Sequence, residues 1–143
     1  MWYLLSVALV MAVTPGMGHN DALATPAPPQ SVGTVSGTFD LFLDRRTAIG
    51  MYVRFELEER AESGAVATIS KSDFTRISGH PTLFSITYPR NRIEQKNSYW
   101  LVTTVAEDRE GARQIATTSS PVLTQGHPST VHVVIQETPE PVE

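Results

Sequence analysis

Two glutamates that lie two positions apart, Glu56 and Glu58, are the residues best placed for acid–base chemistry. In an extended strand they would project from one face about 7 Å apart, a separation that resembles the carboxylate pair of a glycosidase. Arg54 and Arg60 flank them on that face, and neighbouring guanidinium groups keep carboxylates ionised rather than leaving one protonated as a general acid. A solvated strand face laced with charge pairs therefore explains this spacing better than a catalytic pair.

The histidines are the next candidates, as metal ligands or proton carriers. The four are His19, His80, His127 and His132. His80 and His127 each precede a proline, and His132 falls on the outer face of an expected strand. No two have the one or three intervening residues that bring two imidazoles to one metal. The chain contains no cysteine, which excludes thiolate nucleophiles, disulfides, Cys-ligated zinc and iron–sulfur clusters. We expect no metal site and no cofactor.

Composition and motifs favour a protein that acts by binding. The sequence has no Gly-x-Ser-x-Gly elbow, no phosphate-binding glycine loop and no dinucleotide fingerprint. Its 11 Lys and Arg residues are outnumbered by 15 Asp and Glu, giving a net charge of −4. Nucleic-acid binding needs a concentrated basic surface, which this balance disfavours. We therefore expect a monomer that is not an enzyme, binds no nucleic acid and contacts a protein partner.

Strands must position these residues, because hydrophobic residues alternate with polar ones along most of the chain. Alternating runs lie at residues 35–43, 49–60, 84–88, 99–105 and 131–136, with weaker ones at 65–70 and 113–119. Polar turns separate the runs, and at most one short helical turn is expected, near residues 91–96. About seven strands of this kind predict an all-β fold, a single antiparallel β-sandwich, with a small closed barrel as the alternative.

The ends of the chain differ from its middle. Residues 2–13 are apolar and would span about 18 Å as a helix, shorter than the bilayer core of about 30 Å, so we interpret residues 1–24 as an export signal cleaved after Gly18 or Ala24. Residues 25–30 form a proline-rich tether, residues 31–136 the folded domain, and residues 137–143 an acidic, proline-containing tail.

Exposed apolar residues on the expected strands are the candidates for partner binding. If Tyr99, Leu101, Thr103 and Val105 face the core, then Trp100, Val102, Thr104 and Ala106 face outward. Phe42 falls on the polar side of the first strand. Aromatic and aliphatic groups on an outer sheet face are typical of contact surfaces. We therefore predict that Phe42, Trp100 and Val102 bind a partner.

Two segments carry a family resemblance. The first strand contains Val35-Ser36-Gly37-Thr38-Phe39, and the closing stretch reads SPVLTQGHPSTV from Ser120 to Val131. Between them, FSITYP at 84–89 is followed by Ile93 and by the strand that begins at Tyr99. This pattern resembles the YbaY/YscW family of small bacterial envelope lipoproteins over residues 32–136.

The resemblance implies a periplasmic β-sandwich, associated with the outer membrane, that acts by binding. One branch of that family consists of type III secretion pilotins, which help the secretin ring to assemble; the other is a set of envelope lipoproteins of unclear role. Pilotins carry a lipid-modified cysteine after the signal, and this sequence has none. We therefore expect a pilotin-like chaperone that binds a secretin and that is either soluble in the periplasm or held peripherally at the outer membrane without a lipid anchor. The alternatives are a general envelope protein and a ligand-binding sandwich.

Overall fold

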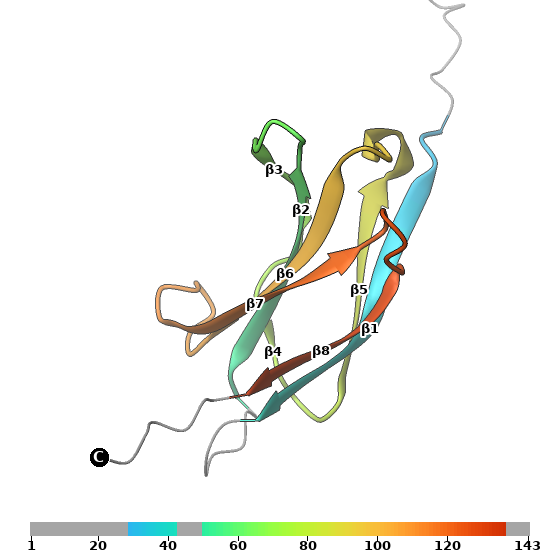
Figure 1. Cartoon of the computed structure of the whole chain (residues 1–143). Helices are drawn as coiled ribbons and strands as arrows, with labels where there is room; N and C mark the ends of the chain where they lie inside the picture. The colour runs from blue at the N-terminus through green and yellow to red at the C-terminus, as the bar shows by residue number, and fades with distance from the viewer. Residues whose placement is uncertain (1–28, 43–49, 137–143) are drawn as a thin grey trace, which may run out of the picture.

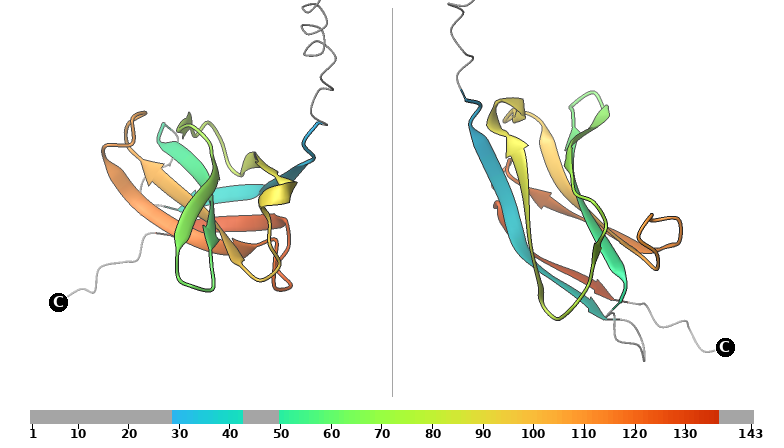
Figure 2. Two further views of the ribbon diagram at one scale, coloured as in Figure 1. Left: turned by 90° about the horizontal axis from the view of Figure 1, so that it is seen from above. Right: turned by 180° about the vertical axis from the view of Figure 1, so that it is seen from behind.

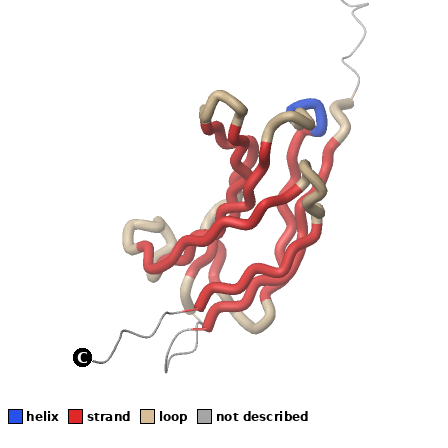
Figure 3. The backbone as a smooth tube through the Cα atoms, in the orientation of Figure 1, coloured by secondary structure: helices blue, strands red, loops and turns tan. Residues whose placement is uncertain are grey.

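The computed structural model describes residues 29–42 and 50–136, which form eight strands in two facing sheets (Figure 1). The strands are β1 (Val32–Phe42), β2 (Tyr52–Arg60), β3 (Val66–Lys71), β4 (Thr75–Arg76), β5 (Thr82–Pro89), β6 (Ser98–Ala106), β7 (Gln114–Val122) and β8 (Thr130–Gln136). A 3-10 turn, η2 (Arg90–Arg92), follows β5 and is the single helical segment of the described residues (Figure 3).

The smaller sheet has the order β5-β1-β8. β1 pairs antiparallel with β5 and parallel with β8, so that the first and last strands lie side by side (Figure 2). The parallel pair departs from the antiparallel arrangement that we expected for every pairing. It is a contact between strands far apart in the sequence, and no turn motif specifies the direction of such a pair.

The larger sheet has the order β3-β2-β6-β7, and β4 pairs with the beginning of β2. β2 and β6 pair along their whole lengths, from Tyr52 opposite Ala106 to Arg60 opposite Ser98. Bulges interrupt the pairing of β2 with β3 and of β6 with β7. The long β2–β6 pair makes a rigid centre for this sheet, and its outward side chains become the surface discussed below.

The core lies between the two sheets and is centred on three phenylalanines from different strands. Phe55 of β2 stacks on Phe84 of β5, with ring centroids 4.2 Å apart. Phe39 of β1 meets Phe55 edge-on at 6.0 Å. Aromatic pairs of both kinds stabilise a core beyond the area they bury. These contacts join the smaller sheet to the larger one.

A glycine in β1 permits the parallel pairing. Gly37 lies between the buried side chains of Val35 and Phe39, and a Cβ added to it would overlap the main-chain carbonyl oxygen of Val131 in β8. The main chain of β8 can approach β1 at this point only because Gly37 has no side chain. The Val-x-Gly-x-Phe pattern of the first strand therefore has a packing role.

The sequence predicted this architecture closely. The all-β sandwich is confirmed, including the two weaker runs, which form β3 and β7, and the two separate sheets rule out a closed barrel. β4 was not predicted, because two residues are too short to show alternation. The expected export segment (1–24), residues 25–28 of the tether and the acidic tail (137–143) lie outside the described residues. Within the described ranges, no helix has the length and apolar character to cross a membrane.

Candidate partner-binding surface

Trp100 and Val102 lie on the outward face of β6, in the middle of the larger sheet. Their cross-strand neighbours are Glu58 and Glu56 in β2 on one side, and Pro121 and Ser119 in β7 on the other. We call this surface, with Arg60, the Trp100 face: Glu56, Glu58, Arg60, Trp100, Val102, Ser119 and Pro121. It has an apolar centre and a charged border along β2.

The indole of Trp100 is held in place by Arg60. The guanidinium carbon of Arg60 lies 4.6 Å from the indole ring centroid, which is a cation–π geometry. Trp100 is half-buried, and its Nε1 is shielded from solvent without a hydrogen-bond partner among the described residues. A shielded N–H without a hydrogen-bond partner destabilises the folded state. The position of the indole is therefore not explained by a hydrogen bond from its N–H group.

Two of the four residues predicted to face outward, Thr104 and Ala106, are 5% and 0% exposed, so they are not accessible to a partner. At this end of the sheet, Phe74 from the β3–β4 loop lies over Arg54, with the guanidinium carbon 4.6 Å from the ring centroid. A Cβ at Gly111 of the β6–β7 turn would collide with the same ring. Phe74 and the β6–β7 turn thus close over the surface here, and only the Trp100 end is accessible.

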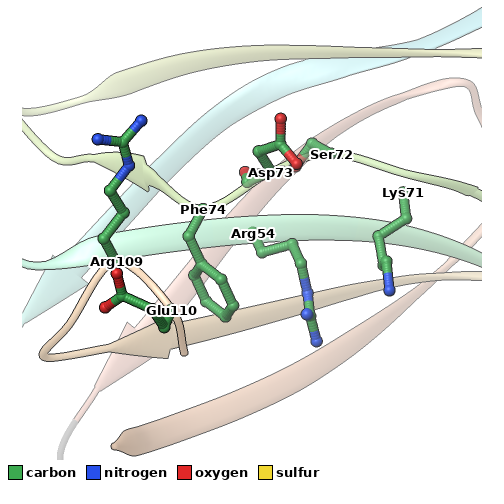
Figure 4. Close-up of a pocket in the computed structure, with 7 residues that line it drawn as sticks. All are labelled: Arg54, Lys71, Ser72, Asp73, Phe74, Arg109 and Glu110. Carbon is green, nitrogen blue, oxygen red and sulfur yellow. Dashed lines mark hydrogen bonds between the residues drawn. The ribbon is translucent and has the colours of Figure 1, made fainter. Parts of the chain in front are cut away.

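A hollow of about 420 Å³ adjoins this covered end. Figure 4 shows Phe74 between Arg54 and Lys71 on one side and Arg109 and Glu110 on the other. Asp73 and Ser72 complete its lining. The hollow is charged and wide open, with one aromatic side chain, so it lacks the apolar enclosure that small-molecule sites usually have.

The glutamate pair occupies the border of the Trp100 face rather than a cleft. Glu56 accepts a hydrogen bond from the hydroxyl of Thr68, and its other carboxylate oxygen lies 4.0 Å from a terminal nitrogen of Arg54. Arg60, which we expected to flank the glutamates, lies over the ring of Trp100. The two carboxylates are therefore surface charges at the border of the apolar centre formed by Trp100 and Val102.

Phe42 belongs to a different surface. It lies at the end of β1, opposite Gln136 of β8, and is 55% exposed on the outer face of the smaller sheet. Trp100 and Val102 are on the outer face of the other sheet, on the far side of the core. The structure therefore brings Trp100 and Val102 together and separates both from Phe42.

A cluster of Asp40, His80 and His132 lies near Phe42, and the spacing of the histidines in the sequence did not predict it. The Asp40 carboxylate lies 3.8 Å from Nδ1 of His80 and 3.5 Å from Nε2 of His132, although the two histidines are 52 positions apart. The nitrogens approach different carboxylate oxygens, and the described residues contain no group of three or more ligands arranged to hold a metal ion. The sequence did place Asp40 and His132 on outward positions of their strands. To predict that they meet, one would have had to know that β1 and β8 pair in parallel.

Tyr99 fixes the strand that carries Trp100. Its ring is buried, and its hydroxyl accepts a hydrogen bond from the Glu94 N–H at 2.8 Å, donates to the Glu59 carboxylate at 2.7 Å and lies 3.1 Å from the Arg92 carbonyl oxygen. Burial, together with the hydrogen bond to Glu59, raises the pKa of Tyr99 above its ordinary value.

Comparisons with known proteins agree with this fold. The family model described as "Type III secretion system lipoprotein chaperone (YscW)" matches residues 31–135. No curated protein matches the chain. A solved structure described as an alternative pilotin from the type II secretion system of Vibrio cholerae is similar, with a TM-score of 0.61 and 15% identity, over 73% of this chain and 95% of that one. At this identity the likeness shows a common fold. The match over residues 31–135 places the chain in the YscW family of type III secretion system lipoprotein chaperones.

Proposed function

We propose that this protein is a non-catalytic, pilotin-like chaperone of the bacterial envelope that binds a segment of a type III secretion secretin and aids its assembly. The observation that carries the proposal is the outward-facing, half-buried pair Trp100 and Val102 at the centre of the larger sheet, in a member of a secretion chaperone family. The secretin segment contacts the protein on the Trp100 face.

The chemistry of this face suits an amphipathic protein segment. Interfaces concentrate their binding energy in a central aromatic or aliphatic cluster and surround it with polar groups that exclude water. Trp100 and Val102 supply such a centre, while Glu56, Glu58 and Arg60 supply the border. Apolar side chains of the segment would cover Val102 and the indole, and its polar side chains would meet the charges of β2.

The family and the fold support a place in the envelope. The family model describes lipoprotein chaperones of a secretion system, and the similar solved structure is a pilotin. This chain would act in the periplasm and reach the outer membrane through the secretin that it binds.

Isothermal titration of the full chain with the C-terminal segment of the secretin from the same organism tests the proposal. We expect Trp100→Ala and Val102→Ser to weaken binding about tenfold or more, as is usual at the centre of an interface. Ile115→Ser is the matched control, because Ile115 is an exposed apolar residue of the same sheet, 40% exposed on β7, outside the Trp100 face. No binding at high micromolar concentration, or equal losses in all three variants, would count against the proposal.

A further inference from the structure

The outer face of the smaller sheet differs in chemistry from the Trp100 face. Of the Asp, Glu, Lys and Arg residues in the described chain, Asp40 alone lies in β1, β5 or β8. The larger sheet carries several such residues on β2 alone, at positions 54, 56, 58, 59 and 60. The smaller sheet instead presents hydroxyl side chains and four of the six large apolar side chains that are most exposed. These four are Val32, Phe42, Leu83 and Val134.

Asp40 lies at the centre of an apolar patch on this face. Leu83 is 79% exposed on β5 and pairs with Thr38, one outward position before Asp40. Val134 is opposite Asp40 on β8, and Phe42 occupies the next outward position along β1. The Asp40 side chain is itself only 18% exposed. A shielded carboxylate bordered by apolar side chains binds a cation more strongly than an open surface carboxylate does, because less water screens it.

We propose that this Asp40 patch is a second binding site, which takes a lysine or arginine side chain flanked by apolar residues in an extended peptide segment. Charge complementarity selects the cation, since the patch offers one carboxylate and no fixed positive charge on its three strands. Outward positions along β1 repeat about every 6.8 Å, which is also the repeat of same-face side chains in an extended peptide. A cation placed over Asp40 thus brings flanking apolar groups onto Leu83 and Phe42.

Two histidines lie beside the Asp40 carboxylate. His80 from the β4–β5 loop and His132 of β8 face Asp40 from the described elements packed against β1, and Thr38 hydrogen-bonds the other nitrogen of His132.

Titration of the full chain with a synthetic peptide, Ac-TLTKTLT-NH2, tests the proposal without any secretin. This peptide places Leu, Lys and Leu on one face of an extended chain. We expect binding at pH 7.5 that falls about tenfold in Asp40→Asn, falls severalfold in Leu83→Ser, and is unchanged in Ile115→Ser, which lies on the other sheet outside both proposed sites. The same peptide with Glu in place of Lys should bind at least tenfold more weakly.

Thermal unfolding of each variant verifies that it is folded. Equal binding of the Lys and Glu peptides, no effect of Asp40→Asn in a folded variant, or no binding at millimolar peptide would overturn the proposal. None of these results bears on the secretin interaction, because the two sites lie on different sheets.

Discussion

Gly37 of β1 lies against the main-chain carbonyl of Val131 in β8, at a point where no Cβ would fit. This approach joins the first and last strands of the smaller sheet in parallel register. The same pairing of β1 with β8 also brings Asp40 and His132 together on the outer face of this sheet. A single small residue thus controls the closure of the fold and the second proposed binding site.

Gly37→Ala should destabilise the protein by about 1–3 kcal/mol, the usual effect of overpacking, since the methyl group would meet backbone rather than a movable side chain. Gly79→Ala is the matched control: a Cβ there meets nothing within 4 Å, and its stability should be nearly unchanged. Urea unfolding of both variants measures the difference. Equal midpoints for the two would show that β8 does not depend on this contact.

Thr103→Val should stabilise the protein by about 1 kcal/mol. Thr103 is fully buried on the core side of β6, and its hydroxyl finds no hydrogen-bond partner in the described part of the chain. Valine has nearly the same shape and removes the unpaired polar group. Thr124→Val should do the opposite, since the buried Thr124 hydroxyl donates to the Asn97 carbonyl at 2.7 Å. Chemical denaturation should show a higher free energy of unfolding for Thr103→Val, and a lower one for Thr124→Val, than for the natural chain.

Tyr99→Phe should lower stability by about 1–3 kcal/mol, because the Glu94 N–H and the Glu59 carboxylate lose their shared partner. The raised pKa of Tyr99 adds a pH signature. The unfolded chain ionises this tyrosine first, so the stabilisation is complete below about pH 10 and is lost as the pH rises through the folded pKa. Unfolding measured between pH 8 and 11 should show a gap between the two proteins that narrows at the alkaline end. A constant gap would contradict this role of the hydroxyl.

Asp108→Asn should reduce the stability of the folded state at neutral pH. The stability of this variant should also change less with pH in the acid range. Hydrogen bonds from the N–H groups of Ala112 and Arg113, at 2.9 and 2.7 Å, lower the pKa of Asp108 below its ordinary value of 3.8. Because the folded pKa is the lower one, the stabilisation is present above about pH 4 and disappears as the pH falls through the folded pKa. Thermal unfolding of both proteins from pH 7 to 2 should show curves that converge in acid. Parallel curves would exclude this contribution of the carboxylate.

Local patterns in the sequence were enough to predict the strands and their faces. Alternation along residues 99–105 placed Tyr99 and Leu101 in the core and Trp100 on the surface, as the structure has them. Contacts between distant segments were not predictable in this way. Phe74 lies over Arg54, the cross-strand neighbour of Thr104, although it is about thirty positions earlier in the chain than Thr104. Alternation within one strand carries no information about such a loop.

The cluster around Asp40 was missed for a related reason. His80 belongs to a loop and His132 to the last strand, and each by itself is an ordinary surface histidine. They meet at Asp40 only because β8 pairs with β1 in parallel and because the loop before β5 returns to the same face. Parallel neighbours have no short turn that marks them in a sequence.

Backbone amide chemical-shift mapping of the full chain, titrated with the C-terminal segment of the secretin, tests the proposed function most directly. If the segment binds the Trp100 face, the largest shifts will fall on β2, β6 and β7 around Glu58, Trp100 and Pro121, together with the indole N–H of Trp100. Residues of β5 and β8 will then change little. Shifts centred on the smaller sheet, or a spectrum unchanged at saturating segment, would contradict the assignment of secretin binding to this face.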